Sequence, residues 1–173
     1  MTLNPNEPNV LFNLAYYPDK NLSLNTKVVT DFSNIPTISD LMFDTMLMNN
    51  GIGLAANQCK INLRMFVMRT AEIRKTFINP IVLSGENKKT FNERCLSFPG
   101  IVITKERFNN IVLAYSDTDG SPQEIELKGI EAICAQHEIE HLDGKTFIDH
   151  LGRLKQKLIA TKVKNARRKS SKF

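Results

Sequence analysis

Apolar residues recur at three- and four-residue steps in three segments of the chain, and this spacing predicts amphipathic helices. The first helix follows Pro36, with Thr37 or Ser39 as its cap, and Asn49-Asn50-Gly51 ends it. The second covers about 129–142 and the third about 151–166. In the third helix we expect the apolar residues on one side and the cations on the other. These apolar residues are Leu151, Leu154, Leu158, Ile159 and Val163.

Short runs rich in β-branched and aromatic residues predict strands at 65–68, 77–83, 101–104, 111–115 and 124–127. Residues 1–35 alternate small apolar patches with Asn, Pro and Asp, which indicates loop and edge strand. The simplest fold is α+β, with mostly antiparallel sheets packed around the second helix and with a C-terminal helix. We expect one domain over 1–166 and a basic, frayed tail over 167–173.

Composition and charge narrow the class of protein. The chain has 173 residues, 42% of them hydrophobic, without a run near the roughly 20 apolar residues that span a bilayer. The amino terminus lacks the pattern of a secretory signal, so we expect a cytoplasmic protein with no membrane partner. The net charge of +5 includes nine Lys or Arg residues and no acid after Asp149, which leaves the rest of the chain at −4. Such a basic segment can bind polyanions, and the alternative is a solvated helix packed on the body.

The strongest chemical signal lies on the second predicted helix, where residues 137–141 read HExxH. The spacing places His137 and His141 on one face, one turn apart, where both can bind one metal. Glu138 can reach a water on that metal, which suits metal-assisted hydrolysis. The alternative is two ordinary histidines that happen to lie four residues apart.

A hydrolytic metal site usually has three protein ligands and an open position for water. His150 lies past the expected end of the helix, so Cys95, in a polar segment bounded by Pro-Gly, is the better third candidate. For Cys134 and Cys59 we favour core packing over ligation. Three cysteines are too few for a disulfide framework.

The first predicted helix is followed by Gly51-Ile52-Gly53-Leu54-Ala55-Ala56-Asn57-Gln58. Two glycines could bind phosphate, but a dinucleotide site fits poorly because a third glycine and a preceding strand are absent. The small residues favour instead the close approach of a second chain. Gln58 supplies an uncharged donor that can stabilise an oxyanion.

Three segments also occur in the order and at the separations of one known family. Residues 51–58 match its GxGxAAxQ motif, 93–97 match EGCLS except at one position, and 136–144 match QHExDHLxG except at one. On these motifs the chain resembles peptide deformylase, from about Val10 to about Ala166. The resemblance implies that 1–166 form a catalytic domain, which removes the formyl group from the N-terminal formyl-methionine of nascent polypeptides.

The resemblance assigns roles to particular residues. It implies three metal ligands, Cys95, His137 and His141. It implies that a metal-bound water attacks the formyl carbonyl while Glu138 acts as general base and then as acid. Gln58 and the backbone N–H of Leu96 would stabilise the oxyanion.

The expected cofactor and partners follow from the same likeness. The family typically uses Fe(II), with nickel or cobalt as functional substitutes, whereas the ligand set alone favours zinc. We take Fe(II) as the expected metal and zinc as the alternative. The expected partners are formylated nascent peptides and, because the C-terminal helix of bacterial members docks on the ribosome, ribosomal RNA. We expect a monomer.

The methionine side chain requires an apolar pocket of restricted size. We expect substrate contacts from Ile52, Gly53, Leu54, Phe91, Arg94, Ile130, Ile133 and Cys134. Arg94 replaces the family's glycine before the ligand cysteine, and it either points to solvent or intrudes on the peptide groove. Glu140 replaces the usual aspartate, and we expect it to face water because it lies off the metal face of the helix, the alternative being a hydrogen-bonding partner of the ligands.

Two other functions remain open at this point. A small metalloprotease would share HExxH but would not need the glycine-Gln loop or a cysteine ligand. A non-catalytic, metal-stabilised or RNA-binding module would have a metal closed by four protein ligands, or no metal.

Overall fold

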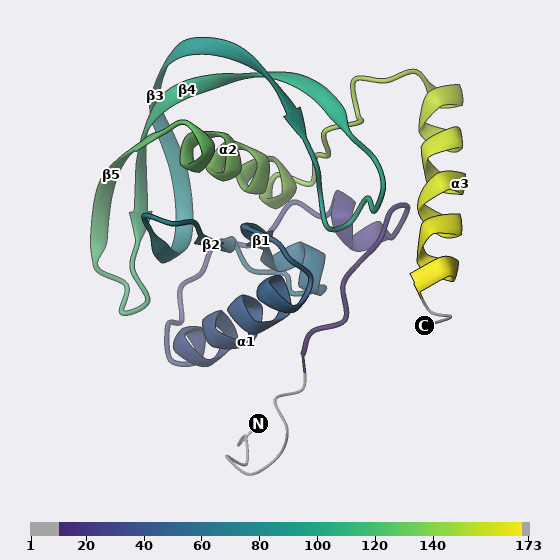
Figure 1. The fold of residues 1–173 in the computed structure, drawn as a ribbon. Coiled ribbons are helices and arrows are strands. Elements are labelled where there is room, and N and C mark those ends of the chain that lie inside the picture. Colours follow the sequence, from purple (N-terminus) through teal and green to yellow (C-terminus); the bar gives the residue numbers. More distant parts are fainter. Residues whose placement is uncertain (1–10, 171–173) are drawn as a thin grey trace.

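The computed structural model describes residues 11–170 and contains one five-stranded antiparallel sheet with the order β1-β2-β3-β4-β5 (Figure 1). The strands are β1 (Gly53–Ala55), β2 (Met65–Arg69), β3 (Arg74–Glu93), β4 (Ile103–Ser116) and β5 (Pro122–Lys128). The α-helices are α1 (Ile35–Met48), α2 (Ile130–Leu142) and α3 (Arg153–Ser170), and two 3-10 helices are η1 (Lys20–Ser23) and η2 (Ala56–Cys59). This architecture confirms the α+β prediction.

Strands β3 and β4 are much longer than the sequence indicated. The strand expected at 77–83 lies inside β3, and those expected at 101–104 and 111–115 belong to the single strand β4. The polar residues of 105–110 interrupt the apolar pattern, but they pair with 86–91 of β3 in a largely exposed ribbon. An antiparallel pair with a face open to water does not need continuous apolar residues.

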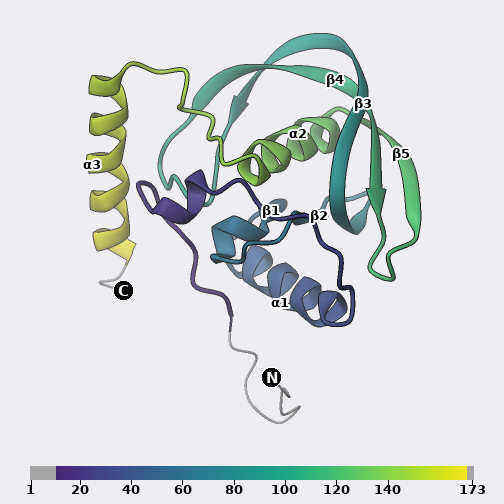
Figure 2. The same cartoon turned by 180° about the vertical axis from the view of Figure 1, so that it is seen from behind.

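Helix α2 lies inside the curve of the sheet (Figure 1, Figure 2). It packs on an apolar cluster that includes Phe66, Phe77 and Leu113. A second cluster around Met42 joins α1 to β1 and β2. Strand β1 contacts both helices, so the glycine-rich segment that contains it lies against α2.

The segment before α1 is mostly irregular. Within 11–34, the regular structure consists of η1 and an isolated bridge between Asn25 and Asp143, and this segment adds no strand to the sheet. The expected loop is therefore observed in the described part of this segment, and the expected edge strand is not. Residues 1–10 lie outside the described residues.

Helix α3 lies on the side of the molecule away from β5 (Figure 2). Its Ile159 and Val163 are buried, whereas Leu154 and Leu158 are exposed, contrary to the expectation of a single apolar side. Leu158 and Ile159 are consecutive, so their side chains point about 100° apart, and the helix packs through only one of the two directions.

The end of α3 also differs from the expectation. The helix continues to Ser170, so 167–170 are helical where we expected a frayed tail, and 171–173 lie outside the described residues. Among the helices that the structure describes, none is both long and apolar enough to cross a membrane.

Candidate active site and metal centre

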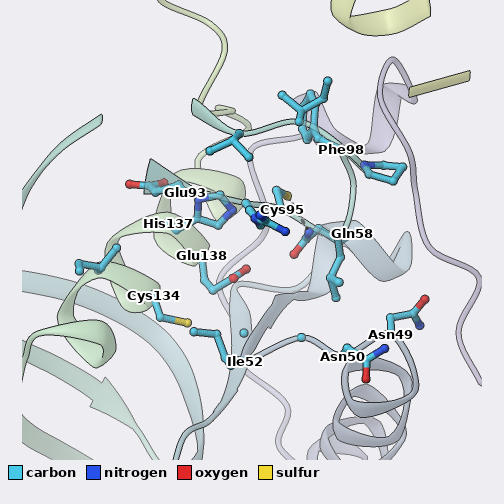
Figure 3. Close-up of a pocket in the computed structure, with 18 of the residues that line it drawn as sticks. Asn49, Asn50, Ile52, Gln58, Glu93, Cys95, Phe98, Cys134, His137 and Glu138 are labelled. Carbon is cyan, nitrogen blue, oxygen red and sulfur yellow. Dashed lines mark hydrogen bonds and ion pairs between the residues drawn. The ribbon is translucent and has the colours of Figure 1, made fainter. Parts of the chain in front are cut away.

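Three possible metal donors meet where the end of β3 faces α2. Cys95 comes two residues after β3, while His137 and His141 lie one turn apart on α2. One donor atom of each lies within 4.8 Å of the other two, and Cys95 Sγ lies 3.2 Å from Nε2 of His141. Figure 3 shows Cys95 and His137 at the centre of a cleft. The chain thus has a metal-binding site made of the three expected residues.

The chemistry of these donors fits a divalent metal ion. Nδ1 of His137 is bonded to Glu93 Oε2 at 2.9 Å, which leaves Nε2 of the same ring for a metal. Burial lowers the pKa of His141, so its ring is neutral, as a ligand must be. Two nitrogens and one sulfur make the three-donor set of catalytic sites that keep a position for water.

A series of ion pairs, on the Nδ1 side of the ring, orients His137. Arg107 of β4 donates to both carboxylate oxygens of Glu93, at 2.6 and 2.9 Å. Burial alone would raise the pKa of Glu93, but hydrogen bonds from Arg107 and His137 lower this pKa to about 2. The ionised carboxylate of Glu93 therefore accepts the Nδ1–H of His137 and orients its ring.

Glu140 does not face water, so that expectation is wrong. Its half-buried carboxylate lies 2.7 Å from Lys105 Nζ and 2.7 Å from Nη1 of Arg107. Lys105 and Arg107 are two positions apart in β4 and therefore point to the same side of the strand. The position three residues after His137 is off the metal face of α2, but it faces this ribbon.

Glu138 is buried beside the donors. Burial raises its pKa to about 7, and its Oε2 has no hydrogen-bond partner within residues 11–170. A Cβ at Gly53 would lie 2.6 Å from Oε1 of Glu138 and 2.4 Å from Cys134 Sγ, so no residue other than glycine fits without a shift. At Gly53 the close approach is that of α2, and the approach of a second chain to the glycine loop stays a prediction.

The side-chain amide of Gln58 is held in one orientation. Its Oε1 accepts a hydrogen bond from the backbone N–H of Ala55 at 2.8 Å, so its Nε2 points the other way. Nε2 donates to Ser97 Oγ at 3.0 Å and lies 3.5 Å from Cys95 Sγ. Gln58 therefore presents its donor toward the metal site, and Leu96 lines the same cleft.

The donors open into a cleft of about 910 Å³. Seven of the eight expected substrate-contacting residues line it: Ile52, Gly53, Phe91, Arg94, Ile130, Ile133 and Cys134. Leu54 is not among the lining residues, because the alternation of β1 buries its side chain in the cluster with α1. Cys134 is both buried and part of the wall, while Cys59 packs in the α1 cluster.

Part of the cleft wall was not foreseen. It includes Tyr16, Asn49, Asn50 and the loop after Cys95, with Phe98 and Ile101. Phe98 stacks on Tyr17 with ring centroids 5.0 Å apart, which joins this loop to the amino-terminal segment. The segments are distant in sequence, and no local pattern indicates that they meet.

Comparison with known proteins gives this site a family. The family model described as "Polypeptide deformylase" matches residues 11–157. The chain belongs to the peptide deformylase family. Peptide deformylases are hydrolytic metalloenzymes, and this chain is accordingly an enzyme that removes the formyl group from N-terminal formyl-methionine.

Individual peptide deformylases are similar over nearly the whole chain. The protein of Chromobacterium violaceum is 39% identical over 158 residues, which is 89% of this chain and 95% of that one. That of Buchnera aphidicola is 40% identical over 167 residues, 94% and 96% of the two chains. The crystal structure of a peptide deformylase from Legionella pneumophila aligns with a TM-score of 0.87 and 34% identity over 95% of this chain and 99% of that chain. That of Ehrlichia chaffeensis in complex with actinonin has a TM-score of 0.84 and 34% identity, covering 90% and 96% of the two chains.

Proposed function

We propose that the chain removes the formyl group from the formyl-methionine of nascent polypeptides in the cytoplasm, as a monomer, with a metal held by Cys95, His137 and His141. One observation carries this proposal: two of the three metal donors line one cleft together with the buried carboxylate of Glu138 and the oriented amide of Gln58. An internal-cutting metalloprotease would not require that amide or a cysteine donor. Sedimentation at assay concentration checks the monomer.

The side chains divide the reaction between them. A divalent metal held by Cys95, His137 and His141 would supply Lewis-acid chemistry and make the attacking water more acidic. Glu138 accepts a proton from the attacking water and returns it to the amine nitrogen as the C–N bond breaks, which yields formate and a free amino terminus. The Nε2–H of Gln58 and the N–H of Leu96 stabilise the negative charge that develops on the formyl oxygen.

Formate release from formyl-Met-Ala-Ser, compared with its unformylated counterpart, tests the proposal. Protein purified without oxygen and loaded with iron should release formate from the first peptide and leave the second intact. Cleavage of the unformylated peptide would favour a metalloprotease, and absence of formate at full metal occupancy would refute the proposal.

We propose Fe(II) as the native metal. This choice rests on the resemblance to the family, since a donor set of two nitrogens and one sulfur also suits zinc. Elemental analysis of protein purified anaerobically from its own cells should find iron. Zinc alone at full occupancy would contradict this assignment, and nickel or cobalt is expected to support activity when substituted.

The Gln58 donor is expected to act mainly on the rate of the chemical step. Gln58→Met keeps the size of the side chain and removes the N–H, so kcat should fall by about 10²–10³-fold with little change in KM. Ser97→Ala removes one hydrogen-bond partner of the amide and leaves the backbone N–H of Ala55 in place, so it should cause a smaller loss. Initial rates of formate release measure both, and a kcat for Gln58→Met within threefold of the wild type would remove this role.

Arg94 is expected to select among substrates. It is exposed, lines the cleft and forms no ion pair among residues 11–170. Because an exposed ion pair contributes up to about 1 kcal/mol, kcat/KM for formyl-Met-Asp-Ser should exceed that for formyl-Met-Lys-Ser by up to about fivefold. Arg94→Gly should abolish the preference, as should high salt. Equal preference in both proteins would show that Arg94 only faces solvent.

We also propose that α3 contacts ribosomal RNA. A hollow of about 580 Å³ between α3 and residues 16–18 is lined by Lys164, Arg167 and Arg168, a surface suited to phosphate groups. Reversing the charge of Lys164 and Arg168 together should release the protein from ribosomes in low-salt sedimentation. Reversal of the exposed Lys88 and Lys89 on β3 is the matched control. Equal co-sedimentation of both variants would sink the idea.

A further inference from the structure

We propose that Glu140 and Lys105 are positioning residues of the metal centre, which act on His137 through Arg107 and Glu93. The inference rests on the proposed ligand set. The contacts form a continuous series: Lys105 to Glu140, Glu140 to Arg107, Arg107 to Glu93, and Glu93 to His137. Each contact is between 2.6 and 2.9 Å.

The contacts nearest the metal site, from Arg107 to Glu93 and from Glu93 to His137, depend on the position of Arg107. Its side chain is 4% exposed, as is that of Glu93, so neither charge can be satisfied by water. The guanidinium binds both oxygens of Glu93, while Oε2 of Glu93 also accepts from His137. A shift of Arg107 would therefore move the carboxylate that orients the metal ligand.

Glu140 holds Arg107 in that position. Glu140 binds two different nitrogens of Arg107, with Oε2 2.9 Å from Nη2 and Oε1 2.7 Å from Nη1. The guanidinium is thus bound by two carboxylates on separate elements, β3 and α2. Such paired contacts fix a planar guanidinium in its plane.

Lys105 balances the charge of this arrangement. Without it, two carboxylates share a single cation in a largely buried place, which is unfavourable. Lys105 Nζ lies 2.7 Å from both oxygens of Glu140 and brings the group of four side chains to neutrality. Glutamate in place of the family's aspartate is one methylene longer, and it reaches Lys105 and Arg107 together.

We expect these contacts to slow the loss of the metal from the wild-type protein. Outer partners of ligating histidines are worth roughly 10–100-fold in metal affinity, and these residues are one step more remote. We expect Glu140→Gln to speed metal release about 10-fold and Lys105→Met about threefold. If Lys105 acts through Glu140, adding Lys105→Met to Glu140→Gln should cause no further change.

Release of Co(II) from the loaded, full-length protein into excess EDTA measures this directly, through the visible absorption of the bound ion. Lys88→Met is the matched control, because Lys88 also pairs with a carboxylate across β3 and β4, at 3.2 Å, but in an exposed place. It should release cobalt at the wild-type rate. Glu140→Asp keeps the charge, so its rate of cobalt release should stay within about threefold of the wild-type rate.

Several results would overturn the proposal. Release rates of Glu140→Gln and Lys105→Met equal to that of Lys88→Met would do so, as would a lower thermal stability of these two variants with unchanged release. Lys105→Met alters a half-buried surface residue, so it gives an answer even if Glu140→Gln folds poorly. The cobalt-release experiment contains no peptide substrate. Its result therefore does not depend on the outcome of the formate assay.

Discussion

Glu138→Gln is expected to lower kcat for formate release by about 10²–10⁴-fold, the usual contribution of a general acid–base group. Glutamine has nearly the size of glutamate and fits the buried place against Gly53, but it cannot accept a proton from water. The metal donors are untouched, so metal content should equal that of the wild type. Initial rates at saturating formyl peptide, together with elemental analysis, measure the two quantities.

Glu131→Gln is the control for this substitution, because Glu131 lies on the same helix and does not line the cleft. It should keep the wild-type rate. A Glu138→Gln enzyme with more than a tenth of the wild-type kcat and full metal occupancy would exclude Glu138 as the proton carrier. Unchanged activity is also what a purely structural metal site would produce.

Cys95→Ser is expected to weaken metal binding by more than about 100-fold, beyond the effect of losing an outer partner of a ligand. A serine hydroxyl stays protonated at neutral pH and is a poor ligand, whereas a cysteine binds as the thiolate. The near-ultraviolet sulfur-to-metal absorption of the Co(II)-loaded protein should disappear. Chelator competition measures the affinity.

Cys59→Ala tests whether any buried thiol gives the same result. Burial raises the pKa of Cys59 to about 12, so it stays a neutral thiol, and it packs in the α1 cluster and is not one of the donors. Its cobalt spectrum should match that of the wild type. An unchanged spectrum in Cys95→Ser would show that the third ligand is another residue.

The sequence predicted the site best where its geometry is local. Two histidines one helical turn apart share a face in any helix, so His137 and His141 needed only the prediction of α2. Cys95 followed from the need for a third donor. The helices α1 and α2 were predictable because each buries one face, and a buried face has a period that can be read from the chain.

The supporting network could not be predicted in the same way. Lys105 and Arg107 lie 35 and 33 residues before Glu140, and they meet it only because the β3–β4 ribbon curves over α2. The polar residues of 105–110, which kept the sequence pattern from predicting this ribbon, include the two cations. The burial of the Leu54 side chain was missed for a related reason, since a strand of three residues has too short a pattern to show which side chains point inward.

The separation of the metal donors along the chain has a thermodynamic consequence. Cys95 and His141 are 46 residues apart and come from different elements, so a bound ion is a cross-link between the end of β3 and α2. An ion that binds only the folded chain stabilises it by mass action, by about 2.7 kcal/mol when its free concentration is 100 times Kd. The resistance of this enzyme to heat is therefore a property of its surroundings as well as of its sequence, and it rises and falls with the supply of metal.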